Sequence, residues 1–489
     1  MTASATTMAF AFNFGAALPE MVLAGSACLI LIVDLFVPNS KRQISYWLTQ
    51  LALLAVAALT YFFFRGDAAP LRALSGMFVA DQMGSVLKIF STVAVSLMLF
   101  YSRSYLAARG LFRGETFVLA LTALLGMMVM ISANSFVSLY LGLELMSLSL
   151  YAMVALQRES ERAIEAAMKY FVLGALASGL LLYGMSMIYG ATGTLDINGA
   201  AEAMVHGHPN RTILVFGLVF VVSAIAFKLG AVPYHMWVPD VYEGAPTAVT
   251  LFIGTAPEFA AFAFAMRLLV GTLSALAFDW QGMLLVLALL SMILGNVVAI
   301  AQTNIKRMLA YSTIANMGFM LMGLLAANSD GYSSAMFYMA SYVLTTLVGF
   351  GIVLLLSREG FEADQLDDLK GLNQRSPWYA FLMLLAMFSL AGVPPTVGFY
   401  AKFSVIWAVV DVGLVWLAVI AVLTSLVGAF YYLRIVKLMY FDDPVDNRPI
   451  EARGDTRVLL SVNGLALLLL GVLPQSLMRL CALALTRSY

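Results

Sequence analysis

Long apolar runs recur from one end of this 489-residue sequence to the other. Each holds roughly 18 or more residues, which is enough for a helix to cross a hydrocarbon core of about 30 Å. Hydrophobic residues make up 62% of the chain and charged residues only 11%, against about 25% charged in an ordinary soluble domain. A water-soluble fold cannot bury so much apolar side chain, so the sequence predicts an all-α polytopic membrane protein.

Charged or Gly/Pro-rich breaks divide these runs into about fourteen predicted transmembrane helices. Only Ser132, Asn134 and Ser135 separate the fourth run from the fifth. No basic region precedes the first run, and Pro19 and Glu20 lie at its entrance, so we expect a membrane span there and not a cleaved signal peptide. The predicted spans are 16–36, 44–64, 80–101, 116–132, 134–156, 168–190, 211–232, 247–273, 281–302, 306–326, 332–357, 377–410, 413–440 and 457–480.

Lysine and arginine residues are concentrated in one set of alternate loops. Because basic loops face the cytoplasm, we expect both termini to be periplasmic. Lys88, Arg434 and Lys437 lie inside predicted spans, where we expect interface anchors. The formal net charge is zero, so nothing indicates a nucleic-acid partner. The basic set comprises Lys41, Arg42, Arg103, Arg109, Arg113, Arg158, Arg162, Lys306, Arg307, Arg358, Lys370, Arg375, Arg448, Arg453 and Arg457.

Two predicted spans are interrupted next to a lysine. The seventh reads SAIAFKLGAVPYHMW, with Pro233 after Lys228, and the twelfth reads SLAGVPPTVGFYAKF, with two prolines before Lys402. Unwound backbone at membrane depth is tolerated only where protein or a water-filled cavity satisfies it. The interrupted spans are five apart, an odd number, so a duplicated five-helix unit would appear in opposite orientations. We therefore predict a three-helix segment (1–115), two inverted five-helix repeats (116–275 and 281–440) that each contain a broken helix, and a C-terminal helix (441–489).

Glu144 is a charged residue inside the fifth predicted span. Tyr140, Ser147 and Tyr151 lie at helical offsets of four, three and seven from it, and these residues form one polar stripe on an apolar helix. Such a stripe faces protein or water rather than lipid. A proton-carrying role is favoured, and a structural carboxylate that joins two helices is the alternative.

Lys228 lies at the interruption of the seventh span. Burial disfavours the charged form of a lysine, whereas a nearby carboxylate restores it, so a partner that moves can make the lysine hold or release a proton. The alternative is a purely structural ion pair. Glu258, inside the eighth span, is expensive to bury alone and is a candidate relay between the two halves.

Two further residues of the first half have ambiguous roles. Lys169 starts the sixth span and either modulates Glu144 or extends to the interface. His235 follows the break beside Lys228, where it either shuttles protons or packs as a satisfied side chain.

Lys402 is the corresponding buried base of the second half. Hydroxyl and amide side chains at helical spacing in the tenth and eleventh spans predict a hydrated path to it, although such stripes also serve as contacts between helices. The candidates are Tyr311, Ser312, Asn316, Tyr338, Tyr342 and Thr345.

The sequence contains no Gly-rich nucleotide loop, no phosphate-binding loop, no cysteine cluster and no paired histidines. Cys28 and Cys481 have no metal-ligand spacing and are expected to pack as apolar residues. We therefore expect no redox cofactor and no ATP site on this chain. Its driving force must come from an ion gradient or from a partner.

Several long stretches resemble the antiporter-like subunits of proton-pumping NADH:quinone oxidoreductase, respiratory complex I. The stretches are LGLELMSLSLYAMVAL, ERAIEAAMKYFVLGA, AFKLGAVPYHMWVPDVYEGAPTAV, IKRMLAYSTIANMGFML and LAGVPPTVGFYAKF. The resemblance implies a proton channel in the bacterial inner membrane, driven by quinone reduction elsewhere in the complex. FMN, iron–sulfur clusters and quinone are then expected on partner subunits, beside further antiporter-like subunits and membrane lipid.

The same resemblance assigns roles by position. Glu144 matches the fifth-helix carboxylate, Lys228 the seventh-helix lysine and Lys402 the twelfth-helix lysine of the family. The family usually has a lysine where this chain has Glu258, so the connecting group is acidic here and its coupling to both lysines has the opposite sign. A cation/proton antiporter, alone or in a multi-chain assembly, and a scaffold that moves nothing are the rival hypotheses.

Overall fold

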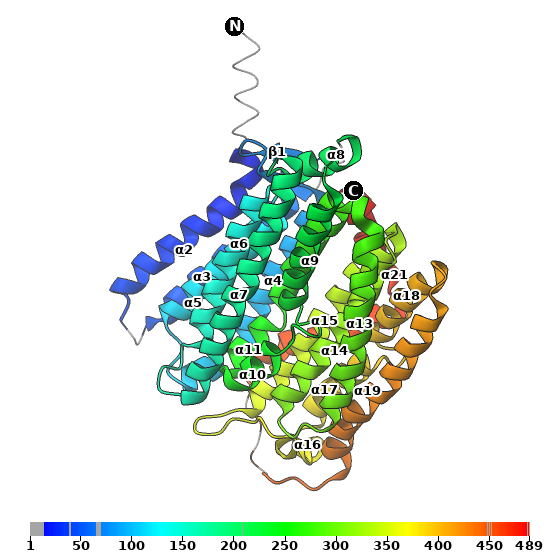
Figure 1. Cartoon of the computed structure of the whole chain (residues 1–489). Coiled ribbons are helices and arrows are strands. Elements are labelled where there is room, and N and C mark those ends of the chain that lie inside the picture. The colour runs from blue at the N-terminus through cyan, green and yellow to red at the C-terminus, as the bar shows by residue number, and fades with distance from the viewer. Residues whose placement is uncertain are drawn as a thin grey trace.

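The computed structural model describes residues 14–38, 41–64, 70–207, 209–446, 448, 450, 452–486 and 488, so residues 1–13 of the predicted N-terminal segment lie outside it. Over this part of the chain, thirteen helical segments are long and apolar enough to cross a membrane. The predicted twelfth span is the remaining one, and it consists of two shorter helices, α17 and α18. The prediction of an all-α bundle with about fourteen spans is confirmed (Figure 1).

Most spans are single helices. They are α2 (Leu18–Phe36), α3 (Gln43–Phe64), α4 (Gln82–Ala108), α5 (Gly114–Ile131), α6 (Phe136–Val154), α7 (Glu161–Thr192), α9 (Arg211–Lys228), α13 (Ala277–Ile300), α14 (Ile305–Leu325), α15 (Ser329–Leu356), α19 (Val415–Phe441) and α20 (Gly454–Val472). The eighth span comprises α11 (Thr247–Ile253), α12 (Ala256–Ala265) and a π-helical segment (Met266–Thr272), and the twelfth comprises α17 (Pro377–Ala391) and α18 (Val397–Asp411).

Short elements join the spans at the two ends of the bundle. An antiparallel hairpin pairs Leu71 with Ala80 and Ala73 with Phe78. This hairpin and α8 lie at the upper end of Figure 1, and α16 lies at the lower end. The short elements are η1 (Phe14–Ala17), β1 (Leu71–Ala73), β2 (Phe78–Ala80), α8 (Ile197–His206), α10 (Trp237–Gly244), η4 (Ser274–Leu276), η5 (Leu366–Leu369), α16 (Leu372–Arg375) and α21 (Gln475–Thr486).

The narrow turn between the fourth and fifth spans is built from the polar residues that predicted it. α5 ends at Ile131, and the Ser135 side chain caps the start of α6. Asn134 Nδ2 donates to the Gly76 carbonyl (2.8 Å) and to Asp196 Oδ2 (3.0 Å), so the turn is tied to the hairpin and to the start of α8. Side-chain caps of this kind satisfy backbone donors that a helix leaves unpaired.

The centre of the bundle is formed by the eighth, tenth and eleventh spans. Burial within their most apolar windows is 100%, 94% and 89%, against 28% for α20 and 39% for α2. The peripheral helices expose large apolar side chains such as Leu35, Phe36 and Leu426. Such an outer surface suits lipid or neighbouring apolar helices rather than water.

Both predicted interruptions are present. α9 ends at Lys228 and is followed by Gly230 at φ +65° and a cis Val232–Pro233 bond before α10 begins. α17 ends at Ala391 and is followed by Gly392 at φ +82° and a cis Pro394–Pro395 bond before α18 begins. Proline removes a helical donor and glycine tolerates the left-handed backbone, so these residues end the helices where the sequence predicts.

The structure also shows two features that the sequence analysis missed. The eighth span is itself interrupted at Gly254 and Thr255, which places Glu258 in the first turn of α12. After α20 the chain forms the further helix α21, so the predicted C-terminal helix is a pair of helices.

The expectation that Lys88 is an interface anchor is wrong. Its Nζ lies 2.5 Å from Glu20 Oε1, and both side chains are buried. The face of α4 that carries Lys88 is covered by protein rather than lipid, so the lysine has a carboxylate partner instead of a route to the interface.

Candidate functional site

Glu144 and Lys228 line one small cavity. Glu144 comes from α6 and Lys228 from the last turn of α9, and the cavity between them has a volume of about 20 Å³. That volume is enough for about one water molecule. Among the ion pairs of the described residues, none joins Glu144 directly to Lys228, while Ser178 Oγ donates to Glu144 Oε1. The arrangement therefore fits a water-separated pair better than a structural salt bridge.

Glu258 lies between the two halves of the molecule. Its side chain is buried in the first turn of α12, and its Oε2 has no hydrogen-bond partner within the described part of the chain. It interacts electrostatically with Lys228 on one side and with Tyr342 of α15 on the other. A buried carboxylate without a direct partner is costly while charged, so its position between the halves marks it as a candidate proton relay.

Lys402 donates hydrogen bonds to a carbonyl at the break in the twelfth span and to a hydroxyl of α19. Its Nζ donates to the Ala391 carbonyl (3.2 Å), at the end of α17, and to Ser425 Oγ of α19 (3.0 Å). The Nζ also lies 4.9 Å from the centre of the Phe319 ring. A Cβ atom on Gly392 would lie 2.9 Å from the Lys402 side chain, so glycine both allows the backbone turn and leaves room for the lysine stem.

A second small cavity, of about 10 Å³, adjoins Lys402 and is lined by Asn316 and Tyr338. From here a chain of hydrogen bonds runs through the second half. Tyr338 donates to Asn316 Oδ1 (2.6 Å), Asn316 Nδ2 donates to Ser312 Oγ (3.3 Å), and Ser312 bonds the Tyr432 hydroxyl (2.5 Å). Hydrogen bonds thus connect three of the predicted path residues, Tyr338, Asn316 and Ser312, and the chain continues to Tyr432.

Two of the three remaining predicted path residues line the Lys402 cavity, and the third does not join the hydrogen-bond chain. Tyr342 bonds Thr313 (2.7 Å) and Thr345 bonds Ser389 (2.9 Å), and both line the Lys402 cavity. Tyr311 is half-buried and does not join the chain. The sequence analysis missed Tyr432, although it lies seven positions after Ser425 and therefore on the same face of α19.

Lys169 and His235 do not reach the Glu144 cavity. Lys169 Nζ lies 2.7 Å from Glu165 Oε1 and 2.9 Å from Asp240 Oδ2. His235 lies in the turn between α9 and α10, half-buried, and its Nδ1 has no hydrogen-bond partner among the described residues. Lys169 therefore acts, if at all, through Asp240 rather than by touching Glu144.

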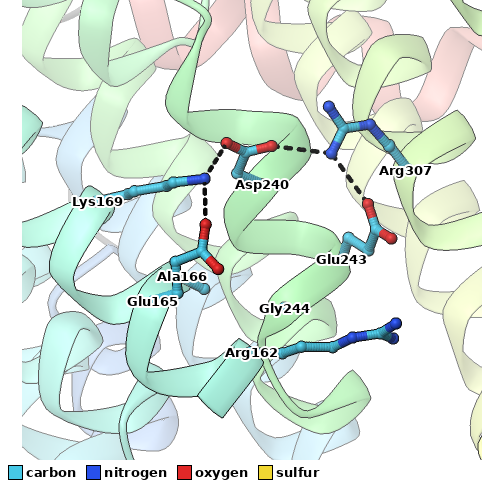
Figure 2. A pocket seen from close by; sticks show the side chains of 8 residues that line it. All are labelled: Arg162, Glu165, Ala166, Lys169, Asp240, Glu243, Gly244 and Arg307. Carbon is cyan, nitrogen blue, oxygen red and sulfur yellow. Dashed lines mark hydrogen bonds and ion pairs between the residues drawn. The ribbon is translucent and has the colours of Figure 1, made fainter.

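A charged pocket of about 200 Å³ surrounds Lys169. Figure 2 shows Lys169 between Glu165 and Asp240, and Arg307 between Asp240 and Glu243. Arg307 Nη1 lies 2.8 Å from Asp240 and 2.9 Å from Glu243. Burial raises the pKa of Asp240, but the hydrogen bonds from Lys169 and Arg307 outweigh burial and hold that pKa below its usual range. Asp240 is thus a stable anion that links α7, α10 and α14.

Glu362, in the segment after α15, is the centre of a second polar cluster that the sequence analysis missed. It accepts hydrogen bonds from Tyr105 (2.9 Å), Arg109 and Thr247, the first residue of α11. Beside it, buried Lys306 donates from Nζ to the Ala245 carbonyl (2.9 Å). Charged residues that the sequence analysis places in loops therefore hold the start of the central eighth span in position.

Replacing Glu362 with Gln tests this cluster through its pH dependence. Burial alone would raise the pKa of Glu362, but Lys306, Thr247 and Arg109 outweigh it, and the pKa lies below its usual value. A carboxylate with a lowered folded pKa stabilises the protein above its unfolded pKa of about 4.3, and that stabilisation is lost as the pH falls through the folded value. We expect Glu362→Gln to lower the thermal stability of the purified complex at pH 7 and to flatten its decline below about pH 5.

The matched control is Glu359→Gln, which changes an exposed glutamate in the same segment. We expect it to leave the stability–pH curve unchanged. Parallel curves for the two variants would show that Glu362 is not held as a charged group.

The sequence matches known families over most of its length. Residues 133–428 match the family model described as NADH:quinone oxidoreductase/Mrp antiporter, transmembrane, and residues 21–131 match that of NADH-ubiquinone oxidoreductase chain 4, amino terminus. NADH-quinone oxidoreductase subunit N of Thiobacillus denitrificans is 60% identical over 98% of both chains.

Solved structures share the fold. A chain of respiratory complex I from Thermus thermophilus is 30% identical, with a TM-score of 0.81 over 95% of this chain and 99% of its own. A chain of the Mrp complex from Dietzia sp. is 21% identical, with a TM-score of 0.84 over 98% of each chain. At that identity the second likeness shows the fold alone.

The fold and the family model place the chain in the class of antiporter-like membrane subunits, and this chain has two interrupted helices beside buried lysines. Within this class, the chain belongs to the NADH-quinone oxidoreductase subunit N family.

Proposed function

We propose that this chain is a proton-translocating membrane-arm subunit of NADH:quinone oxidoreductase in which Glu144, Lys228, Glu258 and Lys402 carry the proton. The observation that carries the proposal is the repeated arrangement of a buried lysine at a helix break beside a small polar cavity, with Glu258 between the two. The catalytic role is a translocase without a redox centre on this chain. Electron transfer through FMN, iron–sulfur clusters and quinone then belongs to partner subunits.

The first half supplies a switchable pair. Glu144 and Glu258 are the two carboxylates that act electrostatically on Lys228. While both are charged they favour a protonated Lys228, and a proton that arrives on either carboxylate weakens that support. Because Glu144 and Lys228 line the same cavity, which has room for about one water, a water there would carry a proton from one to the other.

Glu258 makes the connection between the halves acidic. A lysine at this position would repel a proton on Lys228 or Lys402, whereas a charged Glu258 attracts one. A proton that binds Glu258 neutralises it, and Glu258 then no longer favours a charged Lys228. When Glu258 passes this proton to the second half, it is charged again and the first half returns to its starting state. The acidic residue thus fits an alternating load-and-release cycle.

We propose that residues 116–275 and 281–440 are inverted copies of one five-helix unit. Their first two helices pack with the same close backbone contact: a Cβ atom on Gly126 of α5 would lie 2.3 Å from the Met146 amide of α6, and one on Gly295 of α13 would lie 2.7 Å from the Ala315 amide of α14. The broken helices α9–α10 and α17–α18 occupy matching later places. Small residues at such crossings are the usual means of close packing in membranes.

The apolar perimeter and the charged loops of the bundle bear on its partners and on its orientation in the membrane. Its apolar perimeter suits lipid and the other membrane-arm subunits, including further antiporter-like chains. We propose that both termini are periplasmic and that the charged pocket lies at the cytoplasmic side of a bacterial inner membrane, which the bias of lysine and arginine to one set of loops supports.

Replacing Asn316 with Leu tests the path in the second half. Asn316 bonds Ser312, Tyr338 and the Tyr432 hydroxyl beside Lys402, so an apolar side chain of similar size cuts the hydrogen-bond chain. We expect proton pumping by the assembled complex to fall by about tenfold, because a positioned proton-transfer step contributes at least that much.

The matched control is Asn296→Leu. Asn296 is also buried and accepts a hydrogen bond from Tyr431 (3.0 Å), but it does not line the Lys402 cavity. Equal losses in both variants would show that Asn316 acts through packing rather than proton transfer.

Purification of the native chain separates the proposal from the rival activities. Co-migration with flavin and iron–sulfur subunits supports the oxidoreductase assignment, which the 60% identical relative favours. Sodium-dependent proton exchange by the isolated chain would instead support an antiporter, and pumping that survives loss of all four charged residues would support a scaffold.

A further inference from the structure

The short helix α10 is held by α14 on one side and by α7 on the other. Arg307 of α14 pairs with Asp240 and Glu243 of α10, and Lys306 donates to the carbonyl of Ala245, where α10 ends. On the α7 side, a Cβ atom on Gly244 would lie 2.6 Å from Ala166 Cβ. The position of α10 therefore depends on α14, which belongs to the second half of the chain.

One face of α7 connects two separate cavities. Ala166 lines the charged pocket, and Gly174 lines the cavity of Glu144 and Lys228. Tyr170 lies on the same face, one helical turn or about 6 Å from each of these residues, and itself lines the inner cavity. Any route from the charged pocket to the inner cavity along this face passes Tyr170.

Tyr170 is closed in by aromatic rings. Its ring stacks on Trp237 of α10 with centroids 4.6 Å apart and planes 11° apart, and it meets Tyr151 edge-on at 4.6 Å. Trp237 Nε1 donates to the Phe227 carbonyl (2.9 Å). A Cβ atom on Gly174 would overlap the Tyr151 hydroxyl, so little space remains beside the rings. Apolar ring faces at this density exclude a continuous file of water.

We propose that the charged pocket is the entrance through which protons reach the Glu144–Lys228 cavity, that Tyr170 and Trp237 close it, and that Arg307 holds it closed through Asp240. This inference rests on the proposed function and adds the entrance and its control. Asp240 lies three residues after Trp237 on the same short helix, so a change in the Asp240 ion pairs moves the indole.

The composition of the pocket suits water and protons rather than a bound ion. Three basic residues, Arg162, Lys169 and Arg307, face three acidic residues, Glu165, Asp240 and Glu243. Because the charges balance, the pocket selects neither an anion nor a cation. Its volume of about 200 Å³ has room for several waters.

The backbone gives α10 freedom to shift. It is joined to α9 by the non-helical residues 229–236, where Gly230 is at φ +65°, and it is followed by Ala245 and Pro246 in extended backbone. Residues in loops and at the ends of elements are the usual hinges of moving segments. Movement of α14 can therefore open the entrance without unfolding α7 or α9.

The test measures access to the inner cavity by thiol labelling in the assembled complex. Cys28 and Cys481 are replaced by Ala, and a cysteine is introduced by Ala177→Cys, at a residue that lines the inner cavity. Methanethiosulfonate ethyltrimethylammonium, whose quaternary charge cannot be lost, is applied to oriented vesicles from the side of the charged pocket, and modified peptide is quantified by mass spectrometry. We expect slow labelling while Tyr170 and Trp237 are stacked. After Trp237→Ala we expect labelling about tenfold faster, because the free energy of one aromatic stack corresponds to a change of about that size.

Arg307→Gln should also speed labelling several-fold, and Arg307→Lys should keep it slow. Arg162→Cys, at an exposed residue that lines the charged pocket, should react rapidly in every background. Arg211→Gln, which breaks an exposed pair with Asp279 elsewhere, should change nothing. Unchanged labelling of the inner cysteine in either Trp237→Ala or Arg307→Gln would overturn the inference. Labelling requires no pumping, so this outcome is distinct from failure of the proposed proton path.

Discussion

Replacing Lys228 with Ala in the assembled complex will reduce both proton pumping and coupled quinone reduction by about tenfold or more, since a positioned acid–base group contributes about 10²–10⁴-fold to proton transfer. The loss follows from geometry, because Lys228 lies at the end of α9 in the same cavity as Glu144 and interacts with Glu258 toward the second half. Glu144→Ala should have a similar effect, since it removes the other wall of the water-sized space. Pumping is measured as acidification of inverted vesicles on addition of NADH.

Lys437→Ala is the matched control. This lysine is largely exposed on α19 and pairs with Asp442 (2.9 Å), so its loss should leave pumping intact. NADH oxidation by an artificial electron acceptor reports how much complex has assembled in each variant. Undiminished pumping by both Lys228→Ala and Glu144→Ala would sink the assignment of the first-half pair.

Replacing Arg267 with Met will cause the largest loss of stability among single substitutions in the bundle. Arg267 makes two bonds to Asp81 (2.6 and 2.9 Å) and donates to the Ile131 carbonyl, with both charged side chains almost fully buried. Removal of one partner leaves Asp81 charged and buried, which costs about 3–5 kcal/mol. We expect a marked decrease in the temperature at which the purified complex loses this subunit.

Two comparisons make this result specific. Arg211→Met breaks a pair with Asp279 (3.1 Å) in which the arginine is 72% exposed, and an exposed pair is worth about 0–1 kcal/mol. The double change Asp81→Leu with Arg267→Met removes both charges and should recover part of the loss. Equal shifts for Arg267→Met and Arg211→Met would contradict the argument.

The sequence predicted the broken helices and their lysines because the signals are local. Pro233 lies five residues after Lys228, and Pro395 lies seven residues before Lys402, so helix disruption and buried charge can be recognised in one short window. The hydropathy pattern likewise predicted the spans, because each needs only its own composition to be recognised.

Partnerships between distant residues could not be predicted in this way. Lys169 pairs with Asp240, 71 residues away, and Tyr105 bonds Glu362, 257 residues away. Hydropathy identifies that a residue is charged but not which helix will pack against it. The same limit explains why Lys88 was predicted at an interface, although Glu20 of α2 is its partner.

The burial of the eighth span has a consequence for how the chain is made. The most apolar part of the segment Thr247–Thr272 is wholly covered by protein, yet the segment carries Glu258 and Arg267, and each charge at membrane depth costs about 2.5–3.5 kcal/mol during insertion. Asp81, the partner of Arg267, is synthesised long before it, whereas α14 and α15 emerge later. The nascent span therefore needs to dock on α4 as it leaves the translocon, and it stays exposed at Glu258 until the second half arrives.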